Sequence, residues 1–175
     1  MRPRPPGRPA GRRGPAGFTF IELVIVITIV GILAVAAAPA WMDVARNNLD
    51  VSKRRLITDL SYAREVAIQK HDPVMAKFDV AAGSYTIYRR STGASLADPS
   101  DLARTLNFSF SGQDNSGGVA LASVSIGGME GLRFTSWGTP CDTLGNAIAS
   151  TGFIILTSGQ YTDTVRVEAK TGYVR

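Results

Sequence analysis

The residues of this 175-residue sequence that could do chemistry are few and far apart. The single cysteine, Cys141, and the single histidine, His71, are separated by 70 positions, which leaves no disulfide within the chain, no CxxC site and no Cys–His pair to expect. The C-terminal stretch 162–175 holds only the acids Asp163 and Glu168, too few to surround Ca²⁺. We therefore predict no enzyme, no metal site and no cofactor, with Cys141 as an idle thiol unless it pairs with another chain.

One acid, Glu22, stands out because of its neighbours. The 20 residues 23–42 contain no charged side chain, and about 20 apolar residues are what a helix needs to cross a bilayer. An acid at the edge of such a segment costs roughly a few kcal/mol, so Glu22 calls for a partner. Trp41, near the other end, suits a membrane interface, where tryptophan is enriched.

The net charge of +5 comes from the first 17 residues. They contain five arginines and no acid, whereas the rest of the chain has 14 basic and 14 acidic residues. The basic excess belongs to a short leader, and it does not by itself indicate a nucleic-acid partner.

Three ordinary export signals can be compared with this N-terminus. A secretory signal would be cleaved at Ala38-Pro39-Ala40, a twin-arginine signal would use Arg12-Arg13, and a signal anchor would keep the segment uncleaved. None of them explains Glu22. A protein exported by the general secretory route, soluble after cleavage, stays an alternative.

The string Gly17-Phe18-Thr19-Phe20-Ile21-Glu22-Leu23 resembles the prepilin cleavage motif of type IV pilins and type II secretion pseudopilins, with Phe20 in place of the usual leucine. The resemblance implies cleavage between Gly17 and Phe18 by the prepilin peptidase, N-methylation of Phe18, and a role for Glu22 in subunit assembly. One helical turn would separate the new amine from the Glu22 carboxylate. Pro39 falls where pilin helices commonly carry a proline that loosens the helix. Ala16 departs from the usual basic residue.

A second helix signal follows the apolar segment. Leu49, Leu56, Leu60, Ala63 and Ala67 recur at helical spacing. The residues between them include Lys53, Arg54, Asp59, Arg64 and Lys70, which predicts a charged outer face. We expect the stripe to be core, and Asp72-Pro73 to end the helix.

From residue 74 the pattern is that of strands. Alternation over 74–80, a turn at Ala82-Gly83-Ser84 and the strand 85–88 predict a hairpin. Further strands are expected at 106–110, 119–126, 132–136, 153–157 and 164–169, and 91–104 is expected to be a loop. The fold class is α+β: a long N-terminal helix packed on an antiparallel β domain, as in pilins.

The C-terminal part resembles the GspH/FimT family of minor pseudopilins, in which a strand running from phenylalanine to glycine precedes a terminal G-R-V-R. Here these residues are Phe134, Gly138 and the run Gly172-Tyr173-Val174-Arg175, with Tyr173 in place of the first arginine. Some members hold DNA with basic residues there. The corresponding positions, Arg166, Lys170, Tyr173 and Arg175, are weak candidates for such a contact, because the domain carries almost no net charge.

The resemblance implies a type II secretion pseudopilin placed near the pseudopilus tip, with other pseudopilins, the prepilin peptidase and inner-membrane lipid as partners. The predicted parts are a cleaved leader (1–17), a transmembrane helix (18–42), a periplasmic amphipathic helix (43–72) and a β domain (73–175). The N-terminus would be cytoplasmic. A minor pilin of a type IV pilus, of FimT/FimU type and involved in pilus assembly or DNA uptake, is the nearest alternative.

Overall fold

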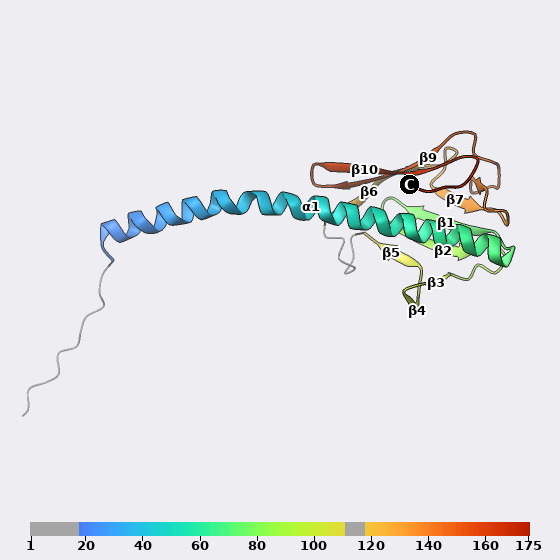
Figure 1. Cartoon of the computed structure of the whole chain (residues 1–175), viewed down its shortest axis with the longest axis horizontal. Coiled ribbons are helices and arrows are strands. Elements are labelled where there is room, and N and C mark those ends of the chain that lie inside the picture. The colour runs from blue at the N-terminus through green and yellow to red at the C-terminus, as the bar shows by residue number, and fades with distance from the viewer. Residues whose placement is uncertain (1–17, 111–117) are drawn as a thin grey trace, which may run out of the picture. The chain divides into compact units, whose positions relative to one another are not determined.

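The computed structural model of the chain describes residues 18–110 and 118–175, with only the backbone described at 35–43. The chain divides into two compact units, Met1–Pro39 and Ala40–Arg175. Helix α1, Phe20–Lys70, contributes to both units, and every strand belongs to the second (Figure 1).

Helix α1 has a polar start and a sharp end. Thr19 precedes its first residue and accepts the Glu22 backbone N–H at its side-chain oxygen, 3.3 Å away. At the other end His71 adopts a left-handed φ of 50°, and Pro73 follows two residues later. A left-handed residue after a helix, with proline beyond it, is a common way to stop a helix, so the predicted stop at Asp72-Pro73 is confirmed within two residues.

The larger sheet is built on the predicted hairpin. Strand β1, Val74–Asp79, pairs antiparallel with β2, Ser84–Arg89, so the hairpin is confirmed. The sheet order is β5-β2-β1-β7-β8, where the added strands are β5, Asn107–Ser109; β7, Gly131–Phe134; and β8, Pro140–Cys141.

A second, three-stranded sheet has the order β10-β9-β6. Its strands are β6, Val119–Ser125; β9, Gly152–Ser158; and β10, Tyr161–Val167, all antiparallel. Each predicted strand from residue 106 onward thus has a counterpart, although β10 begins three residues earlier than expected.

The prediction of a loop at 91–104 is wrong. This stretch contains β3, Ala97–Asp98, and most of β4, Asp101–Thr105, which pair as a small separate hairpin. All five residues of β4 are exposed, so apolar and polar residues have no reason to alternate along it. The pattern on which strand prediction depends is therefore missing.

The second unit has one core between α1 and the sheets. The predicted helical stripe is confirmed, because Leu56, Leu60, Ala63 and Ala67 are fully buried. Four aromatic rings from the larger sheet and the segments beside it pack together with centroids 5.1–6.0 Å apart: Phe78, Tyr85, Phe108 and Phe110. Such tilted and edge-to-face contacts add to the stabilisation from burial.

Asp59 corrects the prediction of a charged outer face. It is only 5% exposed and accepts a 2.6 Å hydrogen bond from the Tyr85 hydroxyl. Arg55, one turn earlier on α1, lies 3.8 Å from the same carboxylate and bonds Asp98 of β3 at 3.2 Å. The helix is thus joined to β2 and β3 by a buried polar contact that helical periodicity could not reveal.

Candidate functional site at the start of helix α1

The first turn of α1 is fully open. Phe18 and Phe20 are each 82% exposed, and Glu22 is the acid of the first turn. Thr19 and Glu22 have the T-x-x-E spacing of a capping box, in which the threonine caps the third helical N–H and an acid follows at that position. This signal was available in the sequence and gives Glu22 a local role, since an acid stabilises a helix N-terminus.

Among the described residues, Glu22 forms no ion pair. Its carboxylate is therefore available to a cation from outside the described part of the chain. A terminal ammonium created at Phe18 would lie two residues before the first residue of α1 and four residues before Glu22. The geometry at the start of α1 is compatible with the partner that the sequence requires for Glu22.

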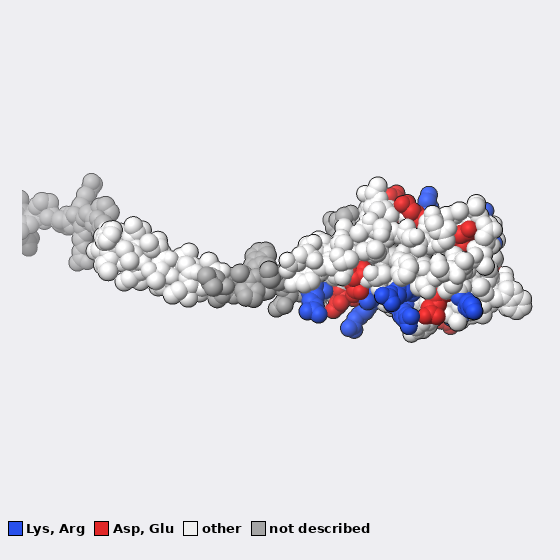
Figure 2. All heavy atoms as spheres, turned by 90° about the horizontal axis from the view of Figure 1, so that it is seen from above, with Lys and Arg blue, Asp and Glu red and all other residues white. Residues whose placement is uncertain are grey.

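The helix surface that follows Glu22 is apolar over residues 23–34 except for Thr28. Over residues 18–34 every side chain is exposed except Val24, which is half-buried. A continuous apolar surface of this kind marks a contact with lipid or with other protein. On the face shown in Figure 2 this stretch carries no charge, whereas blue and red side chains gather on the second unit.

Among the residues whose side chains the structure describes, no helix is both long and apolar enough to span a bilayer. The leader, including Gly17, lies outside the described residues, as do the side chains of Pro39 and Trp41. The predictions for cleavage after Gly17 and for Pro39 in assembly stay predictions.

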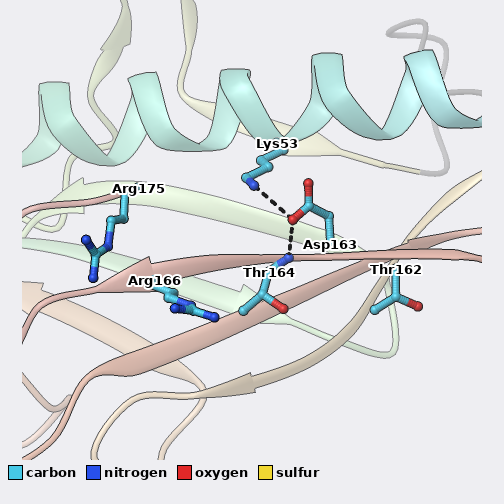
Figure 3. Close-up of a pocket in the computed structure, with 6 residues that line it drawn as sticks. All are labelled: Lys53, Thr162, Asp163, Thr164, Arg166 and Arg175. Carbon is cyan, nitrogen blue, oxygen red and sulfur yellow. Dashed lines mark hydrogen bonds and ion pairs between the residues drawn. The ribbon is translucent and has the colours of Figure 1, made fainter.

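The four C-terminal candidates separate into two groups. Arg166 and Arg175 exchange backbone hydrogen bonds of 2.7 and 3.0 Å and line one groove, of about 540 Å³ (Figure 3). Lys170 and Tyr173 do not line it, and lie on the adjoining turn. The groove contains a third cation that the sequence analysis missed, Lys53 of α1.

Acids neutralise most of this basic cluster. Lys53 pairs with Asp163 at 2.8 Å, and Arg175 pairs with Glu168 at 3.0 Å. Binding to a nucleic-acid backbone grows with the number of phosphates that cations neutralise. Because two of the three cations have acidic partners within the chain, the groove offers little free positive charge to a phosphate.

The remaining candidate nucleophile is enclosed. Cys141 is a free thiol, only 4% exposed, and burial raises its pKa. A buried thiol with a raised pKa is a poor nucleophile. In the part of the chain that the structure describes, no three His, Cys, Asp or Glu residues gather as metal ligands.

Comparisons with known proteins agree with the site at the start of α1. Residues 12–38 match the family described as the prokaryotic N-terminal methylation motif. The match includes Gly17, Phe18 and Glu22, and ends one residue before Pro39. No curated protein sequence matches the chain.

Two solved structures share the fold. The type IV minor pilin FimU of Pseudomonas aeruginosa matches with a TM-score of 0.52 and 16% identity, over 74% of this chain and 88% of that one. The minor pseudopilin EpsH of the type 2 secretion system of Vibrio cholerae matches with a TM-score of 0.53 and 16% identity, over 73% of this chain and 94% of that one. The fold of the chain is pilin-like. Its α+β class and its resemblance to pilin-like proteins, both predicted from the sequence, are confirmed.

Proposed function

We propose that this pilin-like protein is a minor pseudopilin of a type II secretion system. It would join the pseudopilus near its tip, support export of folded proteins across the outer membrane, and catalyse no reaction. The observation that carries the proposal is the methylation motif at residues 12–38, together with the exposed helix surface inside it, which is apolar over residues 23–34 except for Thr28.

Assembly would begin with cleavage of the leader by the prepilin peptidase. The cut between Gly17 and Phe18 would create an ammonium, later methylated, four residues before Glu22, which has no ion pair among the described residues. In the low dielectric of lipid, an unpaired carboxylate is far more costly than at a surface, so Glu22 favours contact with an ammonium. That ammonium is the protein's own or, during assembly, that of a neighbouring subunit.

The same arrangement supports a location. The apolar segment would anchor the chain in the inner membrane with the leader in the cytoplasm, and the unit Ala40–Arg175 would lie in the periplasm. Pro39, at the end of the apolar segment, would relax α1 in the filament, because proline lacks a backbone N–H for the helix.

Cleavage is tested by mass spectrometry of the protein from its native host. We expect a first residue of methylated Phe18 in the wild type, and uncleaved chain in a Gly17→Leu variant. Ala16→Ser, next to the cleavage site, is the matched control and should be processed normally. A mature chain that begins at Trp41 would instead show an ordinary secretory signal and overturn the proposal.

Assembly is tested separately with Glu22→Gln. This variant should be inserted and cleaved but recovered in cross-linked pseudopilus complexes at less than about a tenth of the wild-type amount, a loss equivalent to 1.4 kcal/mol. Thr28→Ala changes another exposed polar side chain of the same helix and should assemble normally. Equal recovery of Glu22→Gln and wild type would rule out the assigned role of Glu22.

A minor pilin of a type IV pilus is the second candidate, and the FimU match is as good as the EpsH match. Deletion of the gene separates the two. Loss of exported enzymes from the medium with normal surface pili supports the secretion role, and the reverse result supports the pilus role. DNA binding receives little support, because acids pair with Lys53 and Arg175 in the basic groove.

A further inference from the structure

A second groove, in the unit Ala40–Arg175, has the features of a binding site. It lies beside the last two turns of α1 and encloses about 430 Å³, within the range of ligand pockets. One wall is α1, through Tyr62, Val66 and Gln69, and the opposite wall is the segment 94–97. Lys70 and Arg89 also line it.

Both walls are held in place by contacts within the chain. The three α1 residues follow the spacing i, i+4, i+7, which puts them on one helical face. Across the groove, Leu96 donates its N–H to Ile87 at 2.9 Å and accepts one from Leu106 at 2.7 Å. The groove is therefore formed before anything binds, which lowers the entropic cost of binding.

The charge of the groove has one sign. Lys70 and Arg89 are its only charged residues, and among the described residues neither forms an ion pair. Arg89 is half-buried and follows Tyr85 and Ile87 at intervals of two along β2, so it belongs to the side of that strand facing α1. The nearest acid along α1, Glu65, is exposed and accepts a hydrogen bond from Gln69.

A half-buried arginine that has no acidic partner among the described residues is unusual, because partly desolvated charges are normally paired. The basic groove of Figure 3 shows the usual arrangement, with Asp163 beside Lys53. The groove beside the end of α1 lacks such an acid. A carboxylate from outside would supply it, and the guanidinium fork of Arg89 fits a carboxylate with two parallel hydrogen bonds.

We propose that this groove binds an extended segment of a partner protein in which a carboxylate is flanked by apolar side chains. Val66 and Leu96, both buried, provide the apolar part of the lining, and Arg89 with Lys70 provides the charge. The lining also includes Tyr62, Ser95 and Gln69, whose hydroxyls and amide oxygen can form hydrogen bonds with the backbone of the segment. This site goes beyond the proposed function and does not depend on cleavage at Phe18.

The test uses the full chain in a neutral detergent and two fluorescein-labelled, amidated peptides. One peptide has a single glutamate between leucines, and the other has glutamine in its place. Fluorescence anisotropy should show at least about tenfold tighter binding of the glutamate peptide, since tenfold corresponds to 1.4 kcal/mol. The preference should shrink in high salt. Equal binding of the two peptides would overturn the proposal.

Variants locate the contact. Arg89→Gln should abolish the preference for the glutamate peptide. Lys70→Gln, at an exposed position where folding is not in question, should reduce the preference severalfold. Arg166→Gln removes a cation from the other groove and should leave the preference unchanged. If Arg166→Gln has the same effect as Arg89→Gln, the peptide responds only to overall charge and the proposal fails.

An anionic lipid surface could also be attracted to two cations. Vesicles containing phosphatidylglycerol are therefore sedimented with the same variants. The proposal predicts that Arg89→Gln changes peptide binding and leaves sedimentation unchanged. Loss of vesicle binding without loss of peptide binding would assign the groove to lipid and overturn the proposal. The processing of the N-terminus in these variants should be normal, so failure here is distinct from failure of the proposed function.

Discussion

Helix α1 exposes its apolar side chains in its first half and buries them in its second. Ile25 is 51% and Leu33 62% exposed, whereas Leu56 and Leu60 are fully buried. The second half has a narrow apolar stripe that the sheets cover, whereas residues 23–34 of the first half are apolar except for Thr28, with no described part of the chain to cover them. The difference shows which half completes its packing within the chain and which half needs another partner.

The acids Asp59 and Glu22, one in each half of α1, differ in the same way, because one has partners among the described residues and the other has no ion pair there. Asp59 is buried, and its carboxylate is bonded by Tyr85 and faces Arg55, whose guanidinium lies 4.4 Å from the centre of the Phe108 ring. Glu22 forms no ion pair with any described residue. A buried acid is tolerated when its bonds are satisfied. The same requirement, applied to an acid beside an apolar segment, indicates that the partner of Glu22 lies outside the described residues.

The largest expected effect comes from truncating one leucine in each half. Leu60→Ala should lower the free energy of unfolding of the second unit by about 2–5 kcal/mol, because it leaves a cavity in a closed core. Leu23→Ala removes the same atoms from an exposed position and should change it by less than about 0.5 kcal/mol. Urea unfolding of the full chain in neutral detergent, followed by near-ultraviolet circular dichroism, measures both.

A comparable loss in both variants would break the comparison. It would mean that the first half of α1 is packed against the same core as the second half. The opposite pattern is expected for recovery in pseudopilus complexes, where Leu23→Ala should matter.

The buried polar contact gives the next largest effect. Tyr85→Phe leaves the carboxylate of Asp59 without its 2.6 Å hydrogen bond and should cost about 1–3 kcal/mol of unfolding free energy. Tyr88→Phe is the matched control, because the Tyr88 hydroxyl donates its hydrogen bond to the sulfur of Met75, at 2.8 Å, and not to a carboxylate. The same urea experiment should show a clearly smaller loss for Tyr88→Phe. Equal losses would show that Asp59 gains nothing from Tyr85.

The pH dependence of stability sharpens the role of Asp59. Burial raises the pKa of Asp59 above the ordinary 3.8, and this effect outweighs the hydrogen bond from Tyr85 and the charge of Arg55, which both lower the pKa. Burial also raises the pKa of Tyr85 well above its ordinary value. A raised pKa means that the folded state binds the proton more tightly than the unfolded state. Folding is therefore favoured as the pH falls through the raised pKa, and the gain is complete below 3.8.

Asp59→Asn removes this titration and keeps an oxygen that can accept the Tyr85 hydroxyl. The unfolding free energy of the wild type, minus that of the variant, should be constant near neutral pH and rise as the pH is lowered toward 4, by about 1.4 kcal/mol per pH unit at most. Urea unfolding at a series of pH values gives this difference. A difference that falls with acidification would mean that the Asp59 pKa is lowered.

Features that depend on sequence spacing could be predicted. The stripe from Leu49 to Ala67, the hairpin turn at Gly83 and the acid four residues after Phe18 each follow from local repeats or from a short motif, and the structure or the family match bears out each pattern. These signals are local because a helix or a hairpin fixes neighbours only a few residues apart.

Contacts between distant segments could not be predicted. Asp59 and Tyr85 are 26 positions apart, and Lys53 and Asp163 are 110 apart. No spacing rule connects such pairs, because the register of α1 on the sheets decides which side chains meet. The groove beside the end of α1 could not be predicted for the same reason, because its walls come from α1 and from the segment after β2.

The smallest effect on overall stability is expected from the cap of α1. Thr19→Ala removes the acceptor of the Glu22 N–H and costs about 1 kcal/mol of helix stability at that end. Because the cap lies in the exposed half, we expect faster amide exchange at Glu22 and Leu23 with no change in urea unfolding of the second unit. In the control, Thr28→Ala, the lost hydroxyl bonds only the carbonyl of Val24 and caps nothing, so exchange at Glu22 should not change. A lower urea midpoint in Thr19→Ala would show that both halves of α1 unfold as one cooperative unit, and the contrast between them would then be one of surface alone.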